Sequence, residues 1–380
     1  VPKLVTKVGH IRVFAAFASM ASLSSLIHVV FVDPYIWILA RFLTGFSMIG
    51  IFIIVESWLN DRANNKTRGK VLSLYMLITY VGMSLGNFLL NISNPKYYEP
   101  FILISLLFSI ALIPILLTKR KPPKFKKTSS IDIKELFKIS PFGSFSMICT
   151  GFIFAPLFSL LSVYAVTMKL SIFETSLLLA GVMLAGALFQ WPIGSLSDKY
   201  DRRKIIIGSS IAAVIFSILA IFVSGVGNSL PNFFLESAVS FNYFSSVMDK
   251  TKLFISIILL AGVTLPLFSL NLALVNDYIP KEKFVAAGGG LNIIFGLGAM
   301  AGPIICSTLM RFLGPNGFFV HLIIFLFAII IFGFYRLSQR KIEDNPESTF
   351  TPMPTSITPL GIELDPDTGV DLSNNEEKKN

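Results

Sequence analysis

Long apolar stretches separated by short polar segments dominate this chain of 380 residues. A helix needs about 20 mostly apolar residues to cross the hydrocarbon core of a bilayer. Ten stretches of the sequence approach that length, so we predict ten membrane-spanning helices. Their ranges are Ile11–Val32, Tyr35–Trp58, Val71–Asn91, Pro100–Leu117, Phe142–Val166, Ser176–Ile193, Ile205–Val223, Leu253–Asn276, Val285–Met310 and Phe318–Tyr335.

The composition supports this prediction. Hydrophobic residues make up 53% of the chain and charged residues only 14%, and the mean hydropathy is +0.72. These values lie outside the range of ordinary soluble domains. We therefore expect an all-α integral membrane protein that has the lipid bilayer as its main partner.

The net charge is +10, which in a soluble protein would suggest nucleic-acid binding. If the loops alternate between two sides, however, one side carries 24 Lys and Arg residues and the other carries five. Because such an imbalance marks the cytoplasmic side, we predict a multi-pass protein of the inner (plasma) membrane. The visible N-terminus and the C-terminal tail would be cytoplasmic, and no nucleic-acid partner is expected. The basic segments are 1–12, 59–70, 119–141, 195–204, 277–284 and 336–341.

The residue types that carry enzymatic or metal chemistry are scarce. Cys149 and Cys306 both fall inside predicted spans, without the spacing of a disulfide or a metal site. His10, His28 and His321 are scattered along the chain. We therefore expect no catalytic residues, no metal and no cofactor, and the sequence does not favour an enzyme.

One polar loop, Gly194–Lys204, lies between two apolar runs and reads GSLSDKYDRRK. It resembles the signature loop of the major facilitator superfamily of secondary transporters, Gly-x-Leu-(small)-Asp-(basic)-x-Gly-Arg-(basic). Only the second Gly departs from this pattern, and Asp201 stands in its place. The resemblance covers about residues 1–340 and implies a two-lobed helical bundle of the bacterial type.

The start of the chain resembles a degenerate copy of the same loop. In residues 2–12, Gly9 matches the second Gly, Lys7 the basic position and Thr6 the position of the Asp. In the family this loop follows the second of twelve helices. The ten visible spans would therefore be helices 3–12, and the sequence would be truncated at its N-terminus.

The resemblance and the composition together divide the chain into parts. The basic linker 119–141 includes a candidate amphipathic helix at 131–138. Residues 337–380 are rich in Asn, Pro, Ser and Thr, and we expect a disordered tail. The loop 225–252 would either pack on the outer rim or be mobile, with rim packing favoured. The predicted parts are an N-terminal lobe at 1–118 with four of six helices, the cytoplasmic linker at 119–141, a C-terminal lobe at 142–336 with six helices, and the tail at 337–380.

Two pairs of glycines at four-residue spacing occur in corresponding spans of the two lobes, as Gly82 with Gly86 and Gly298 with Gly302. This spacing lets helices approach closely. We interpret all four as helix-packing residues and not as substrate ligands.

The signature loop supplies the candidate gate. By the resemblance, Asp198 should approach the start of the span at Val71, near Arg68, because helix N-termini attract negative charge. The same resemblance implies that neighbouring basic residues complete a charge network that closes the inner side. The alternative is that these residues only fix the topology. The gate candidates are Gly194, Asp198, Lys199, Arg202, Arg203 and Arg68.

Within the apolar cores almost nothing carries a formal charge, and the exceptions are Arg41 and Glu56. A charge inside a span usually has a function. Arg41 opens the segment Arg41–Gly45, which resembles the Arg-x-x-Gln-Gly motif of the family's fourth helix, with Thr44 in place of Gln. It either anchors an anionic group in the cavity or extends to the outer surface. Glu56 either pairs with a basic residue at the helix end or serves as a gating or proton-linked acid.

Uncharged polar residues on the spans are further cavity candidates, and the alternative for each is a helix–helix hydrogen bond. The candidates are Tyr75, Asn271 and Asn292, followed by Thr79, Thr150, Gln190 and Ser269.

The resemblance implies transport of a small-molecule substrate by alternating access. Because the sequence contains no nucleotide-binding loop, we expect a gradient to drive this transport. The nearly uncharged spans favour export of an amphipathic solute that is neutral or weakly anionic, and coupling to protons is left open. We expect a monomer. The alternative is a non-transporting membrane receptor or scaffold that retains the transporter fold.

Overall fold

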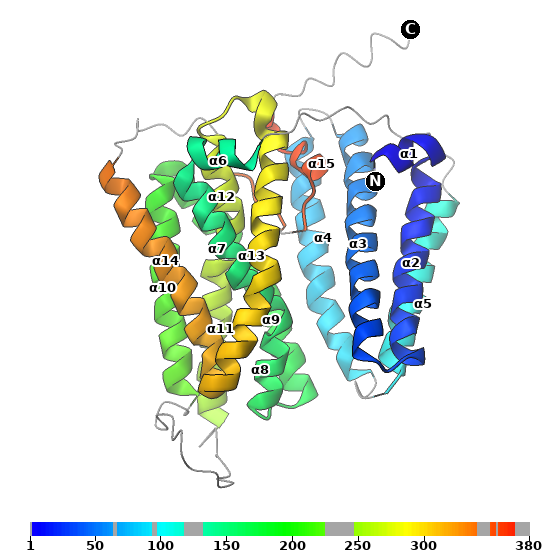
Figure 1. Ribbon diagram of the computed structural model, residues 1–380, viewed down its shortest axis with the longest axis horizontal. Coiled ribbons are helices and arrows are strands. Elements are labelled where there is room, and N and C mark those ends of the chain that lie inside the picture. The colour runs from blue at the N-terminus through cyan, green and yellow to red at the C-terminus, as the bar shows by residue number, and fades with distance from the viewer. Residues whose placement is uncertain are drawn as a thin grey trace.

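The computed structural model describes residues 2–63, 67–92, 97–117, 132–224, 247–339, 350–354 and 356–368. The described residues form long helices and short helical turns (Figure 1). Within the described part of the chain, nine stretches are long and apolar enough to cross a membrane, and the ninth, 284–339, holds two consecutive helices. Each of the ten predicted spans therefore corresponds to at least one helix.

The helices form two groups that lie side by side (Figure 1). In the sequence, residues 118–131 lie between the two groups. The N-terminal group has blue to cyan ribbons and the C-terminal group has green to orange ribbons. The N-terminal group contains α1 (Pro2–Val8), α2 (His10–Val30), α3 (Pro34–Arg62), α4 (Arg68–Phe88), η1 (Leu89–Asn91) and α5 (Glu99–Leu116). The C-terminal group contains α6 (Ile133–Ile139), α7 (Pro141–Ser159), α8 (Leu161–Thr167), α9 (Ile172–Lys199), α10 (Arg202–Val223), α11 (Val247–Thr264), α12 (Leu267–Asn276), η3 (Lys281–Lys283), α13 (Phe284–Leu313), η4 (Gly314–Asn316) and α14 (Gly317–Gln339).

Local sequence signals explain where several helices begin. The Asp33 carboxylate accepts hydrogen bonds from the backbone N–H groups of Tyr35 and Ile36 at the start of α3. Ser171 and Glu174 form a reciprocal capping box at the start of α9. Gly9 has a φ of 98° and separates α1 from α2, a conformation that glycine adopts without steric cost.

The two predicted glycine pairs have different surroundings. A Cβ added to Gly302 of α13 would lie 2.7 Å from the carbonyl oxygen of Phe152 in α7, and Gly298 meets the α7 backbone even more closely. The structure differs at Gly82 and Gly86, where an added Cβ would meet no described atom within 4 Å. These two glycines face away from the described helices, contrary to the packing role expected.

The two groups meet along α4 and α9. The side chain of Ser84 donates to the carbonyl of Ala180 at 3.4 Å, and Asn91 donates to Ser176 at 2.9 Å. We call the end of the bundle near these contacts, where α4 ends and α9 begins, the opposite end. The other end carries α1, α6 and the Asp198–Asp201 loop, and we call it the basic end.

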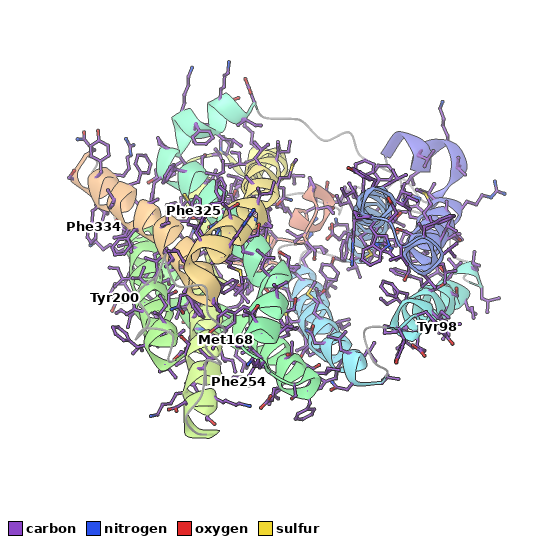
Figure 2. All side chains as sticks on the ribbon, turned by 60° about the horizontal axis from the view of Figure 1, so that its bottom comes forward. Tyr98, Met168, Tyr200, Phe254, Phe325 and Phe334 are labelled. Atoms are coloured by element: carbon purple, nitrogen blue, oxygen red, sulfur yellow. The ribbon has the colours of Figure 1, made fainter. Side chains whose placement is uncertain are left out.

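The largest departure from expectation is the tail. The prediction of disorder is wrong for residues 350–354 and 356–368, which include α15 (Pro359–Ile362) and η5 (Pro366–Thr368). It is also wrong for 337–339, which complete α14. Figure 2 shows the α15 ribbon between the two groups of helices. Four apolar side chains of this segment, Met353, Ile357, Ile362 and Leu364, belong to the main buried core, which also contains residues of both groups.

Two other predicted segments lie partly outside the described residues. The helix predicted at 131–138 is present as α6. The loop predicted at 225–252 lies outside the described residues from 225 to 246, and residues 247–252 are already part of α11.

Candidate functional site

The candidate site is the region between the two groups of helices at the basic end, which we call the mouth. Residues of α3 and α4 on one side and of α9, α12 and α13 on the other contact the C-terminal segment there. The residues 350–354 and 356–368, which we call the plug, lie in it.

Glu56 of α3 is the centre of the N-terminal wall and is fully buried. Its carboxylate accepts the hydroxyl of Tyr75 at 3.0 Å and the backbone N–H groups of Thr358 and Gly361, each at 3.0 Å. The hydroxyl of Thr358 donates a further hydrogen bond to it. A buried carboxylate is tolerated when such donors satisfy it, so Glu56 and Tyr75 form one polar site that holds the plug.

Two more side chains of the N-terminal group contact the plug. Asn60, one turn after Glu56, donates to the carbonyl of Leu360. Arg68, at the start of α4 and only 2% exposed, donates to the hydroxyl of Thr368 at 3.3 Å. Arg68 therefore lies in the mouth, and one of its partners is the plug.

The C-terminal wall binds the plug through three helices. Asn292 of α13 donates to the carbonyl of Ile357 at 2.8 Å. Ser269 of α12 accepts the backbone N–H of Met353 at 3.0 Å. The carboxylate of Asp198 in α9 accepts the backbone N–H of Phe350 at 2.7 Å. All three of these wall residues were candidates from the sequence, Asp198 for the gate and Asn292 and Ser269 for the cavity.

The signature loop forms a charge network within its own lobe. Arg202, 2% exposed, pairs with Asp277 at 2.6 Å and with Asp198 at 3.1 Å. Arg203 pairs with Asp201 at 2.8 Å, and Lys199 is exposed.

Asp201, the residue that departs from the family's signature, has a structural role. Its carboxylate accepts the backbone N–H of Arg203 at 2.9 Å. It thereby caps the start of α10, as an Asp does at many helix N-termini.

The predicted approach of Asp198 to the start of α4 is not made in this structure. The described partners of the Asp198 carboxylate are Arg202 and the backbone of Phe350. An added Cβ on Gly194 would also overlap the ring of Phe350. The plug therefore takes the place beside the signature loop where the other lobe was expected.

The remaining candidates lie outside the mouth. Arg41 is exposed and sits fifteen residues before Glu56 on α3. At 100° per residue the two share one face, about 22 Å apart along the helix. Asn271 is fully buried and donates to Thr150 of α7 at 3.0 Å, so it makes the helix–helix hydrogen bond named as its alternative.

Sequence reasoning missed the plug. The candidate Gln190 lies deeper between the lobes and makes the helix–helix hydrogen bond named as its alternative. Gln190 of α9 donates to the hydroxyl of Tyr80 in α4 at 3.3 Å and accepts from Ser269 at 3.4 Å. A signal for the plug was present, because apolar residues recur through the polar tail. They are Phe350, Met353, Ile357, Leu360, Ile362 and Leu364.

Burial raises the pKa of Asp365, within the plug, to about 6. The backbone N–H of Asp367 and the hydroxyl of Thr351 partly offset this rise, since both donate to the carboxylate. Among the described residues no three His, Cys, Asp or Glu side chains lie together as a metal site requires.

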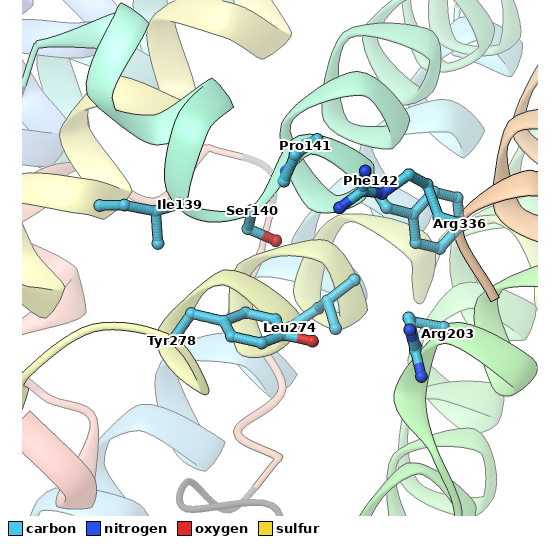
Figure 3. Close-up of a pocket in the computed structure, with 8 residues that line it drawn as sticks. All are labelled: Ile139, Ser140, Pro141, Phe142, Arg203, Leu274, Tyr278 and Arg336. Atoms are coloured by element: carbon cyan, nitrogen blue, oxygen red, sulfur yellow. The ribbon is translucent and has the colours of Figure 1, made fainter. Parts of the chain in front are cut away.

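A separate small pocket lies in the C-terminal lobe (Figure 3). Two arginines, Arg203 and Arg336, line it together with Tyr278 and Phe142. It is formed by α7, α10, α12 and α14 with the residues before α7, so no wall of it comes from the N-terminal group.

The fold and the mouth define a class, namely an all-α, multi-pass membrane protein with two helical lobes. The family model of the Major Facilitator Superfamily matches residues 2–248. The chain belongs to this superfamily of transporters.

Curated relatives agree with this assignment. The chain is 22% identical over 286 residues to the "Uncharacterized MFS-type transporter YcaD" of Escherichia fergusonii, a match that covers 75% of this chain and 68% of the relative. It is 23% identical, with the same coverage, to the proteins of that name from Escherichia coli K12 and O157:H7. The superfamily is one of membrane transporters rather than enzymes, which agrees with the sequence interpretation.

Proposed function

We propose that this protein moves a small molecule across a bilayer by alternating access, with the basic end in the cytoplasm. The 24 Lys and Arg residues of the basic segments support this orientation. The observation that carries the proposal is the difference between the two ends of the lobe interface. Helices α4 and α9 contact each other directly toward the opposite end, whereas the plug stands between the lobes at the basic end. Such a difference supports the proposal because it is expected of a transporter that is open on its cytoplasmic side.

The distribution of charge in the lobes supports the class of substrate. Arg41 and Glu56 are the ionisable residues within the apolar core of α3 and share one face. Glu56 is satisfied by hydrogen-bond donors, whereas no described residue forms an ion pair with Arg41. We propose that the substrate is an amphipathic solute that is neutral or weakly anionic. The protein would act as a monomer in the inner (plasma) membrane and export this solute, driven by an ion or solute gradient.

Flux in proteoliposomes tests this proposal. The purified chain would be reconstituted and assayed with a neutral amphipathic dye, a weakly acidic amphipathic dye and inorganic phosphate as a hydrophilic control, with and without a pH gradient. We expect flux of the two dyes above that of empty liposomes. Arg41→Gln should lower flux of the acidic dye more than flux of the neutral dye.

The alternative function, a receptor or scaffold that retains the fold, predicts binding of a dye without flux under every gradient. That result would overturn the transport proposal. A stimulation of flux by an inward or outward pH gradient would identify protons as the coupling ion.

A further inference from the structure

The plug is a well-packed part of the molecule. The side chains of Met353, Ile357, Ile362 and Leu364 are each at most 2% exposed. Burying such side chains is the dominant favourable contribution to ordering a segment. This burial explains why a tail of disorder-prone composition adopts a defined path.

The plug extends from the basic end inward between the two lobes. Ser269, which binds the backbone of Met353, lies seven residues from the end of α12, or about 10 Å along the helix axis. Asn292, which binds Ile357, lies eight residues from the start of α13, about 12 Å inward. The plug therefore occupies the path that a solute would take between the lobes.

Glycines lie at the closest approaches between the plug and the lobes. An added Cβ on Gly194 would overlap Phe350, and one on Gly288 would overlap Ile362. On the plug itself, a Cβ on Gly361 would lie 2.6 Å from the Glu56 carboxyl carbon. Both lobes and the plug thus have complementary shapes where they meet.

The plug also binds both lobes through polar contacts. Glu56 and Asn60 hold it from the N-terminal lobe, and Asn292, Ser269 and Asp198 hold it from the C-terminal lobe. The lobes cannot close on each other at the basic end while this segment lies between them.

We propose that the C-terminal plug is an intramolecular inhibitor that docks in the mouth, excludes solute and holds the lobes open at the basic end. Docking itself does not depend on transport. The regulatory consequence rests on the proposed alternating-access function.

A disulfide tests docking directly in the full chain. The Cβ of a cysteine at position 289 would lie 3.8 Å from the Cβ of Pro359, the usual separation in a disulfide. Gly289→Cys combined with Pro359→Cys should cross-link α13 to the plug. As a control, Gly296→Cys is placed two turns deeper on α13, where an added Cβ meets nothing within 4 Å.

We expect about tenfold more cross-linking for the first pair than for the control pair under mild oxidation of membranes. Free cysteines would be counted by a mobility shift with a maleimide polymer, and the native cysteines are both buried. Equal cross-linking of the two pairs would overturn the docked position.

Accessibility at the opposite end tests inhibition. Ser84 is 5% exposed in the α4–α9 contact, and Ser84→Cys would react with a membrane-impermeant maleimide only when that contact opens. Thr358→Ala removes one hydrogen bond to the Glu56 carboxylate, and Ile357→Asp places a charge at a buried apolar position. Pro366→Ala, at an exposed position of the plug, is the matched control.

We expect labelling of Ser84→Cys to rise about tenfold with Thr358→Ala, since hydrogen bonds to charged groups are strong, and further with Ile357→Asp. Labelling should be unchanged with Pro366→Ala. Equal labelling in all four proteins would overturn inhibition. If the Thr358→Ala and Ile357→Asp proteins were labelled faster but showed no dye flux, the proposal that the plug docks and holds the lobes open would stand. The proposed transport function would then be overturned instead.

Discussion

The carboxylate of Glu56 accepts the backbone N–H of Thr358 at 3.0 Å, although the two residues lie 302 positions apart. The contact joins the second spanning helix of the chain to its C-terminal segment. It places one of the two charges found in the apolar cores at the docking site of the plug. The role of Glu56 in this conformation is therefore to bind a peptide segment.

Replacing Glu56 with Gln should weaken docking of the plug. The variant keeps the size of the side chain, but it loses the charge and turns amide donors toward the N–H groups of Thr358 and Gly361. Hydrogen bonds to charged groups contribute about 1.5–3 kcal/mol each, so we expect at least about a tenfold loss of docking. The measurement is the cross-linking of Gly289→Cys with Pro359→Cys.

Glu174→Gln is the control for that variant. Glu174 caps α9 at the opposite end and pairs with Lys250 at 2.9 Å, far along α9 from the mouth. Its replacement should leave the cross-linking unchanged. Equal cross-linking in the Glu56→Gln protein would show that apolar burial alone holds the plug.

Acid should strengthen docking through Asp365. Burial raises the pKa of the docked carboxyl to about 6 from its ordinary value of 3.8, so docking takes up a proton. The contribution of the protonated Asp365 to the free energy of docking is fully present below pH 3.8 and is lost as the pH rises through about 6. The difference between these two pKa values corresponds to about 3 kcal/mol of docking free energy at most. The other titratable or charged groups around the Asp365 carboxyl are Asp367 and Arg202 and Arg68, which lies beside Thr368. Lys281 and Lys283 are in η3, which packs on η5.

Hydrogen exchange of residues 350–368 in the full chain would measure this effect, after correction for the intrinsic pH dependence of exchange. Protection should rise between pH 7 and pH 5. Asp365→Asn should remove most of that rise, because the amide does not titrate. Protection that increases toward alkaline pH would contradict the assignment.

The fold was predictable because its main determinants are local in sequence. An apolar stretch of spanning length forms a helix in a bilayer since its backbone polar groups have no other partner there. The ten ranges and the signature loop followed from that rule and from the resemblance. The exact helix ends depended on caps such as Asp33 and Ser171.

The mouth was only partly predictable. Glu56 and Asn292 were recognised as candidates because polar side chains are rare in spans. These residues alone, however, did not indicate that the C-terminal plug would be their partner. The plug is ordered by contacts across about 300 positions, and composition reports only on local tendency. The spacing of Ile357, Leu360 and Leu364 was the available signal, and Pro and Thr residues around it obscured it.

Arg202 should be the most sensitive residue of the signature loop. Its guanidinium is buried between Asp277 and Asp198 and also donates to the carbonyl of Ala273 at 3.0 Å. Arg202→Met would leave Asp277 without this buried counter-charge, and breaking such a pair costs about 3–5 kcal/mol. We expect a clear fall in the thermal unfolding midpoint of the detergent-solubilised protein. The exposed Lys199→Met should change it little, and a similar fall for both would assign the effect to net charge.

The glycines of α13 and α4 should respond in opposite directions to the same substitution. A Cβ on Gly298 would overlap the backbone of Ile148 in α7, so Gly298→Ala should separate two packed helices and destabilise the protein by about 1–3 kcal/mol. Gly82→Ala meets no described atom and should stabilise α4 by up to about 1 kcal/mol, because alanine favours the helix more than glycine does. Thermal unfolding of the two variants side by side separates the effects. Destabilisation by Gly82→Ala of the same size as that by Gly298→Ala would mean that α4 packs through this face as closely as α13 does.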